Sequence, residues 1–92
     1  MATQGTTTID FGAAPGNTNA SVAVSSPAIT GTQLTSAWIA PADTADHNVE
    51  EHVVEEIEVY AGPAQAGVGF TIYAVCRVGR AYGQFNIGWV YN

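Results

Sequence analysis

Two stretches near the end of the chain alternate apolar and polar side chains, and this period of two residues limits the fold more than any other feature. Residues 70–78 and 84–91 both follow it. Because successive side chains of a β-strand point to opposite faces, each stretch is predicted to be a strand with one buried face. Residues 79–83 between them contain two glycines, so the pattern predicts a β-hairpin. The predicted inward-facing residues are Phe70, Ile72, Ala74, Cys76 and Val78 in the first strand and Phe85, Ile87, Trp89 and Tyr91 in the second.

Earlier parts of the chain repeat this alternation more weakly. It covers residues 6–11, 21–25, 33–40 and 54–61, and turn-forming residues fill the breaks. About six short strands at this spacing indicate an antiparallel sandwich or a small barrel. We predict an all-β fold, an antiparallel β-sandwich in which residues 1–92 form a single domain. The core is expected to contain Trp38, Phe70, Phe85 and Trp89.

Charged residues are rare and concentrated. Seven of the eight acidic residues and both histidines fall within residues 43–58, lysine is absent, and Arg77 and Arg80 are the only basic residues. A net charge of −6 argues against binding to nucleic acid or to an anionic membrane surface, since both need clustered lysine and arginine. The charged fraction of 11% is well below the usual ~25%. A surface of small neutral residues suits a protein partly covered by copies of itself, so we predict a homo-oligomer.

The acidic segment offers possible ligands for a divalent cation, namely Asp46, His47, Glu51 and His52. Carboxylates alone would suit calcium, whereas two imidazoles with a carboxylate would suit zinc or a similar metal. The histidines do not have the spacing that places two imidazoles on one helical face. The alternative is a solvated acidic loop whose histidines bond to backbone or carboxylate groups. Thr44 is a suitable N-cap for residues 45–51, which are expected to form a single helical turn or an ordered loop. No other cofactor is predicted.

Catalytic groups are not evident in the sequence. Cys76 lies on a predicted inward face, where a thiol behaves as a small hydrophobic group, and a single cysteine cannot form an internal disulfide. The glycines match no phosphate-binding loop. Paired carboxylates could serve glycoside hydrolysis, but such enzymes need a cleft that a chain of this length seldom builds. We therefore predict that the protein is not an enzyme.

Signals for export or membrane insertion are not expected. The first eight residues lack both the basic and the apolar region of a secretory signal. The apolar runs are far shorter than the ~20 residues of a membrane helix. We therefore expect synthesis in a cytoplasm.

The candidates for contact with a partner are Tyr60, Tyr73, Arg77 and Tyr82. The tyrosines are predicted on outward strand faces or turns, where their amphipathic rings suit a protein interface or a sugar. Arg77 is predicted on an outward face opposite Glu56 or Glu58, in a cross-strand or intersubunit ion pair. We favour a subunit interface for these residues, and sugar recognition is the alternative.

Several segments resemble small uncharacterised proteins encoded by tailed bacteriophages: Thr8–Gly12, Thr44–His52, Ala66–Ala74 and Gly83–Val90. The likeness extends over nearly the whole chain. It implies a protein of the virion that is made in the cytoplasm of the bacterial host. The implied role is structural, as a capsid decoration protein or a small component of the tail or fibre, in contact with other virion proteins.

Residues 69–91 are also similar to the H-type lectin domain, chiefly in the strand that begins Gly69-Phe70-Thr-Ile and in the closing Ile87-Gly-Trp89-Val-Tyr91. That family implies an antiparallel β-sandwich that assembles as trimers and hexamers. Its arginine- and aromatic-rich sugar site has no counterpart in this sequence. The expected function is a bacteriophage structural protein that acts through homo-oligomeric contacts as a trimer or hexamer. The alternative is a carbohydrate-binding adhesion module on a phage appendage.

Overall fold

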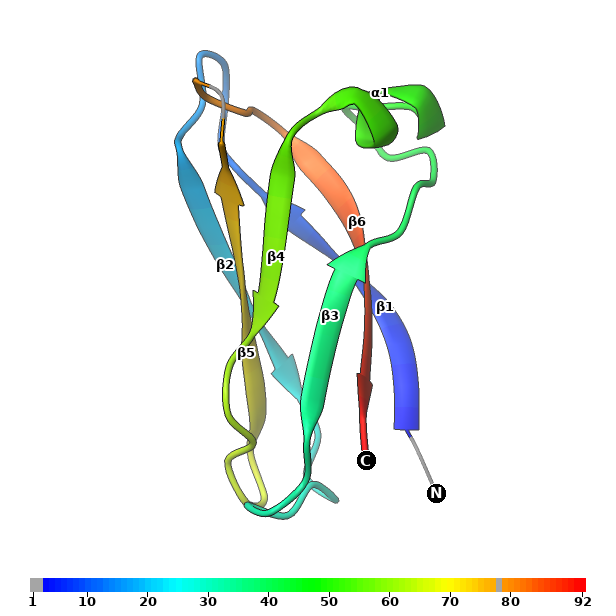
Figure 1. The fold of residues 1–92 in the computed structure, drawn as a ribbon, viewed down its shortest axis with the longest axis vertical. Coiled ribbons are helices and arrows are strands. Elements are labelled where there is room, and N and C mark those ends of the chain that lie inside the picture. Colours follow the sequence, from blue (N-terminus) through cyan, green and yellow to red (C-terminus); the bar gives the residue numbers. More distant parts are fainter. Residues whose placement is uncertain (1–2, 78) are drawn as a thin grey trace.

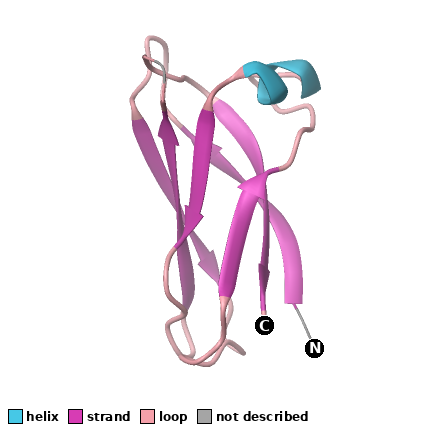
Figure 2. Cartoon of the chain, viewed as in Figure 1, coloured by secondary structure: helices cyan, strands magenta, loops and turns pink. Residues whose placement is uncertain are grey.

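Two antiparallel sheets of three strands each make up the fold, as a computed structural model shows for residues 3–77 and 79–92 (Figure 1). One sheet has the strand order β1–β6–β3 and the other has the order β2–β5–β4. A short helix, α1, lies at one end (Figure 2). The prediction of an all-β sandwich is confirmed. The strands are β1 (Thr3–Asp10), β2 (Asn19–Ser25), β3 (Thr35–Ile39), β4 (Ile57–Ala61), β5 (Gly69–Cys76) and β6 (Gln84–Tyr91), and α1 covers Val49–Val54.

The hydrophobic core lies between the sheets because the strands alternate buried and exposed residues. Phe85 and Ile87 of β6 are fully buried, and Phe11 packs edge-on against Phe85 with 5.8 Å between ring centroids. Trp89 is partly buried at the border of this core. The predicted inward faces of both late strands are thus confirmed, apart from Val78, which lies outside the described residues. The buried apolar residues are Ile9, Phe11, Val24, Ile29, Phe70, Ile72, Ala74, Cys76, Ala81, Phe85, Ile87 and Tyr91.

The predicted hairpin between residues 70–78 and 84–91 is wrong. β5 pairs with β2 and β4, whereas β6 pairs with β1 and β3, so the two strands lie in different sheets. The connection between them crosses from one sheet to the other (Figure 1). A period of two shows which side chains are buried but not which strand is the neighbour, because the strands of both sheets alternate in the same way.

Trp38 lies outside the core, contrary to the prediction. Ala37 and Ile39 take the inward positions of β3, so the pleat turns Trp38 outward, where it is 44% exposed. Its indole lies against Gly88, its direct partner on β6, and a Cβ added at Gly88 would be 2.5 Å from Trp38 Nε1. On the inner face, Trp89 covers its own partner, Gly5 of β1, in the same way. Two tryptophan–glycine pairs therefore join β6 to both of its neighbours.

Charged side chains gather at the end of the sandwich that carries α1. Residues 11–42, 59–76 and 81–92 contain no charged side chain, and these ranges include both loops at the opposite end. The acidic segment leads into and out of α1 (Figure 1). Within the described chain, no helix is long and apolar enough to span a membrane. The molecule therefore has one acidic end and one neutral end.

Phe85→Ala is expected to lower the free energy of unfolding by about 3–5 kcal/mol, because it opens a cavity in the core. In a small domain with a total stability of about 5–10 kcal/mol, such a loss leaves the protein close to unfolded. Trp38→Phe, on the outer face, should cost less than about 1 kcal/mol. Urea denaturation followed by circular dichroism measures both changes. Equal losses for the two variants would contradict the assignment of Phe85 to the core.

Candidate functional site

Two buried histidines hold the acidic segment against the end of the sandwich. His47 and His52 are only 5% and 3% exposed. Both rings pack on Phe85: His47 is stacked on it at 4.2 Å between ring centroids, and His52 meets it edge-on at 5.1 Å. Both imidazoles therefore pack on the core from the acidic segment. Figure 1 shows α1 of this segment at one end of the sandwich.

Each histidine is hydrogen-bonded through both ring nitrogens. His52 Nδ1–H donates to the Asn48 carbonyl, and its Nε2 accepts from the backbone N–H of Asn86, both at 2.8 Å. Since one nitrogen donates and the other accepts, this ring is neutral in the observed arrangement. His47 donates from Nε2 to the Tyr82 carbonyl at 2.5 Å and from Nδ1 to the Glu51 carboxylate at 3.2 Å. Two acceptors on one ring favour its protonated form.

Opposing effects set the pKa of His47. Burial lowers it, but the hydrogen bonds to the Tyr82 carbonyl and to Glu51 raise it by more, so the pKa lies above its ordinary value of 6.5. The pKa of Glu51 is lowered from 4.5, first by the hydrogen bond from the Asn48 backbone N–H and then by His47. The two side chains therefore favour each other's charged form.

Three further polar residues of this segment attach it to β6 or form α1: Thr44, Asp46 and Asn48. Thr44 Oγ1 donates to the Gln84 carbonyl, and the Asp46 carboxylate accepts from the Gln84 N–H, both at 2.8 Å. Asn48 is the N-cap of α1 and forms a capping box with Glu51. The predicted N-cap, Thr44, is therefore wrong, because its hydroxyl is committed to β6 and the helix begins later.

The four predicted metal ligands do not come together as a metal centre. The imidazole nitrogens of His47 and His52 are all engaged in hydrogen bonds, and Asp46 and Glu51 accept from backbone N–H groups. Among residues 3–77 and 79–92, no group of three or more His, Cys, Asp or Glu side chains is arranged to hold a metal ion. The observed hydrogen bonds are those expected from the alternative to a metal site, an acidic segment whose histidines bond to backbone and carboxylate groups.

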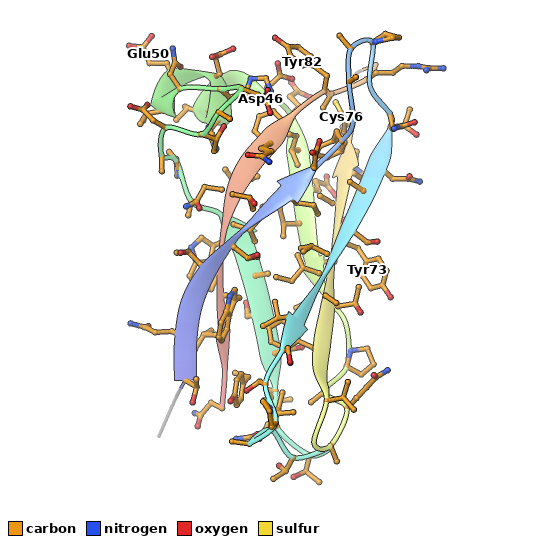
Figure 3. All side chains as sticks on the ribbon, turned by 180° about the vertical axis from the view of Figure 1, so that it is seen from behind. Asp46, Glu50, Tyr73, Cys76 and Tyr82 are labelled. Atoms are coloured by element: carbon orange, nitrogen blue, oxygen red, sulfur yellow. The ribbon has the colours of Figure 1, made fainter. Side chains whose placement is uncertain are left out.

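Three of the four predicted contact residues meet on the outer face of the β2–β5–β4 sheet, which we call the tyrosine face. Tyr60 of β4 and Tyr73 of β5 are direct cross-strand partners, and they are 48% and 49% exposed. Figure 3 shows Tyr73 projecting away from the sandwich. The other outward residues of these strands, apart from Glu58, are small or uncharged: Asn19, Ser21, Ala23, Ser25, Thr71 and Val75.

An ion pair lies at the acidic end of the tyrosine face. Arg77 Nη2 donates to the Glu58 carboxylate at 2.5 Å and to the Tyr60 hydroxyl at 3.1 Å, and that hydroxyl donates to Glu58. The predicted cross-strand pair is confirmed, with Glu58 as the partner of Arg77. The hydrogen bonds from Arg77 and Tyr60 lower the pKa of Glu58 to about 2. Because both charged side chains are half exposed, the pair adds little to stability, and both remain accessible to a partner.

Tyr82 lies apart from the tyrosine face. It precedes β6 and packs beside His47, with 4.9 Å between ring centroids. Figure 3 shows it at the acidic end with Asp46 and Glu50. The structure therefore separates this tyrosine from Tyr60 and Tyr73, with which the sequence analysis grouped it.

A groove on the outer face of the β1–β6–β3 sheet escaped the sequence analysis. It has a volume of about 330 Å³, and we call it the indole groove. The alternation of β3 could have indicated this groove. If Ala37 and Ile39 both face the core, Trp38 between them must face outward. The side chains of Trp38, Gln4 and Thr6 make no hydrogen bond to another described residue. The lining residues are Gln4, Gly5, Thr6, Trp38, Ala40, Gly88 and Trp89.

Comparison of the chain with protein-family models, with curated protein sequences and with solved structures finds no match. A proposal of function therefore rests on the surfaces described above.

The pair His47–Glu51 is expected to stabilise the fold within a limited pH window. The folded pKa of His47 lies above 6.5, so its contribution is complete below that value and is lost as the pH rises through the folded pKa. The folded pKa of Glu51 lies below 4.5, so its contribution is complete above that value and is lost as the pH falls through the folded pKa. The contribution of the charged pair is therefore largest between these two values.

Glu51→Gln isolates this effect, because glutamine still completes a capping box. The variant should lower the free energy of unfolding most at about pH 5–6 and least at about pH 9. Urea denaturation across this range measures the difference from the unmodified protein. A difference that stays constant up to pH 9 would contradict the assignment of a protonated His47.

Proposed function

We propose that this chain is a structural protein of a bacteriophage particle, either a capsid decoration protein or a small tail or fibre component, that acts through homo-oligomeric contacts at its tyrosine face. The observation that carries the proposal is the in-register pair of Tyr60 and Tyr73, half exposed on an almost uncharged sheet. Tyrosines are enriched at protein interfaces, where the ring is covered while the hydroxyl keeps a hydrogen bond.

The distribution of charge supports contact through this face. Most of the acidic side chains lie around α1, whereas the tyrosine face carries one balanced pair, Arg77 and Glu58. Copies that meet through the tyrosine face can exchange these partners across the contact, so that Arg77 of one copy faces Glu58 of another. Opposite charges at the rim of an interface favour the correct orientation of the partners. Contact between two acidic ends would instead bring like charges together.

The phage setting is supported by the segments that resemble small phage proteins. In this chain the segment Thr44–His52 supplies the hydrogen bonds that attach α1 to β6. The likeness therefore includes residues on which the fold depends, and not surface residues alone. We therefore extend this resemblance to a structural role in the virion.

Light scattering of the purified chain should give the mass of a discrete trimer or hexamer at micromolar concentration, with and without EDTA. The double variant Tyr60→Ala/Tyr73→Ala should weaken the assembly by at least about tenfold, because it removes two aromatic side chains from the contact. Tyr82→Ala is the matched control: its ring is similarly exposed, at 44%, but lies off the tyrosine face, so the mass should not change. A stable monomer that is absent from purified particles would contradict the proposal.

A second candidate function is carbohydrate binding, and the indole groove is the observation that favours it. Small-ligand sites combine apolar and aromatic walls with a few polar groups, and their volumes start at about 300 Å³. The groove offers the indole of Trp38 for the apolar C–H face of a sugar, and the amide of Gln4 and the hydroxyl of Thr6 for its hydroxyl groups. Its lining contains no charged residue, so a neutral saccharide suits it better than a charged ligand.

Trp38→Ala should abolish saccharide binding while leaving the fold intact, because Trp38 is not part of the core. A glycan array of neutral saccharides identifies a ligand, and titration calorimetry measures it. The expected loss of affinity is about tenfold or more. Tyr73→Ala, which removes a similarly exposed ring from the other sheet, should bind as the unmodified protein does. An array without a hit, or equal binding by Trp38→Ala, would exclude this second function.

A further inference from the structure

β1 is an edge strand with a free side. Among the described residues it pairs with β6 alone, over Thr3–Asp10. Phe11 N–H donates to the Gly83 carbonyl at 3.0 Å and continues this ladder. Residues of an antiparallel pair alternate between bonding to the partner strand and pointing away from it. The odd-numbered residues of β1 therefore bond to β6. The N–H and C=O groups that face the free side are those of Gln4, Thr6, Thr8 and Asp10.

This free edge lacks the features that normally prevent strands from pairing. Natural edge strands are protected by lysine, by proline, by bulges or by short length. β1 has eight residues, contains neither lysine nor proline, and carries no charge before Asp10. Its register with β6 runs without a bulge. In both Figure 1 and Figure 3, the N-terminal half of β1 lies at the side of the sandwich with no other element beside its free edge.

We propose that β1 pairs with β1 of a second copy in an antiparallel, two-fold arrangement, so that the two β1–β6–β3 sheets join into one. This inference rests on the proposed function, since it describes how copies of the structural protein are connected. With the two-fold axis at Thr6, each Thr6 faces its counterpart, and Gln4 faces Thr8 of the other copy. Threonine has a high β-propensity, and threonine pairs across strands stabilise them.

The position of the acidic residues selects the antiparallel direction. Asp10 is the last residue of β1 and pairs with Gln84, to which Asp46 is also bonded. In the proposed register the two Asp10 residues are separated by roughly 27 Å, at ~3.4 Å per residue. That distance exceeds the Debye length of about 8 Å at physiological salt, so the acidic ends are screened from each other. Parallel pairing would place both acidic ends side by side.

β2, one of the two edge strands of the other sheet, is less suited to the same pairing. Cys76 N–H donates to the Thr18 carbonyl, so the odd-numbered residues of β2 face its free side. These residues are serine, alanine and asparagine, which have little preference for strands. β2 therefore provides a matched control for changes made in β1.

Thr6→Pro tests the inference. Proline removes the N–H on the free side of β1 and leaves the hydrogen bonds to β6 in place. Because a two-fold contact joins copies in pairs, it requires the hexamer, and its loss should halve the mass to that of a trimer in light scattering. A trimeric unmodified protein would overturn this inference and leave the proposed function standing. Ser21→Pro removes the corresponding N–H of β2 and should leave the mass unchanged. Thr6→Lys blocks the edge without the conformational restriction of proline and should also halve the mass.

Amide hydrogen exchange in the assembled protein provides a second readout. The N–H groups of Thr6 and Thr8 should exchange at least about tenfold more slowly than solvent-exposed amides, as expected for hydrogen-bonded strands. If they exchange rapidly and both Thr6 variants keep the full mass, the edge contact is excluded while the oligomeric function stands. Loss of assembly in Ser21→Pro alone would place the contact at β2 and overturn the inference. A monomeric unmodified protein would overturn both the inference and the proposed function.

Discussion

The packing of two imidazoles on Phe85 is the interaction on which the arrangement of this molecule depends. A segment with seven carboxylates would otherwise remain in solvent, because its charges repel one another. His47 and His52 bury their rings and satisfy both of their nitrogens, so the segment is attached to the end of β6 at little cost in unpaired polar groups. His47 faces two acceptors, which favour its protonated form, whereas His52 faces one acceptor and one donor.

Attachment of this segment separates the surface into regions with different properties. The acidic end carries most of the charge of this lysine-free protein. The two outer sheet faces and the neutral end are left almost without charge, and each of the two faces carries half-exposed aromatic rings. The tyrosine face lies on one sheet, whereas the indole groove and the edge of β1 lie on the other sheet and share Gln4 and Thr6. A subunit can therefore use one of them for a neighbouring copy and still present another to a different partner.

Much of the fold, but less of its connectivity, is predictable from the sequence. Alternation identifies the strands and the buried faces of β5 and β6, because it reports directly on the pleat. Alternation does not show which strands pair. The predicted hairpin is wrong for this reason: residues 79–83 cross from one sheet to the other and do not form a hairpin turn. Trp38 was assigned to the core for its size, although the positions of Ala37 and Ile39 require the opposite face.

In the candidate site, too, some contacts can be predicted from the sequence and others cannot. The contact of Arg77 with Glu58 follows from the outward positions of both residues on strands that proved to be neighbours. The roles of the histidines do not follow from local sequence, because their partners Tyr82 and Asn86 are more than thirty residues away along the chain. The four candidate metal ligands are close in sequence, yet their side chains are engaged in hydrogen bonds to backbone groups and, for His47 and Glu51, to each other. Proximity along the chain thus gave a misleading picture of their chemistry.

The reciprocal tryptophan–glycine pairs constrain how this protein can evolve. Each indole occupies the space that a side chain on the facing strand would need: a Cβ at Gly5 would lie 2.6 Å from Trp89, and one at Gly88 would lie 2.5 Å from Trp38. A change at either glycine therefore conflicts with a residue far away in sequence. The residues of each pair, Trp89 with Gly5 and Trp38 with Gly88, can therefore be substituted together but not one at a time. In any set of related sequences, these two pairs should covary and thereby mark the register of all three strands of the sheet.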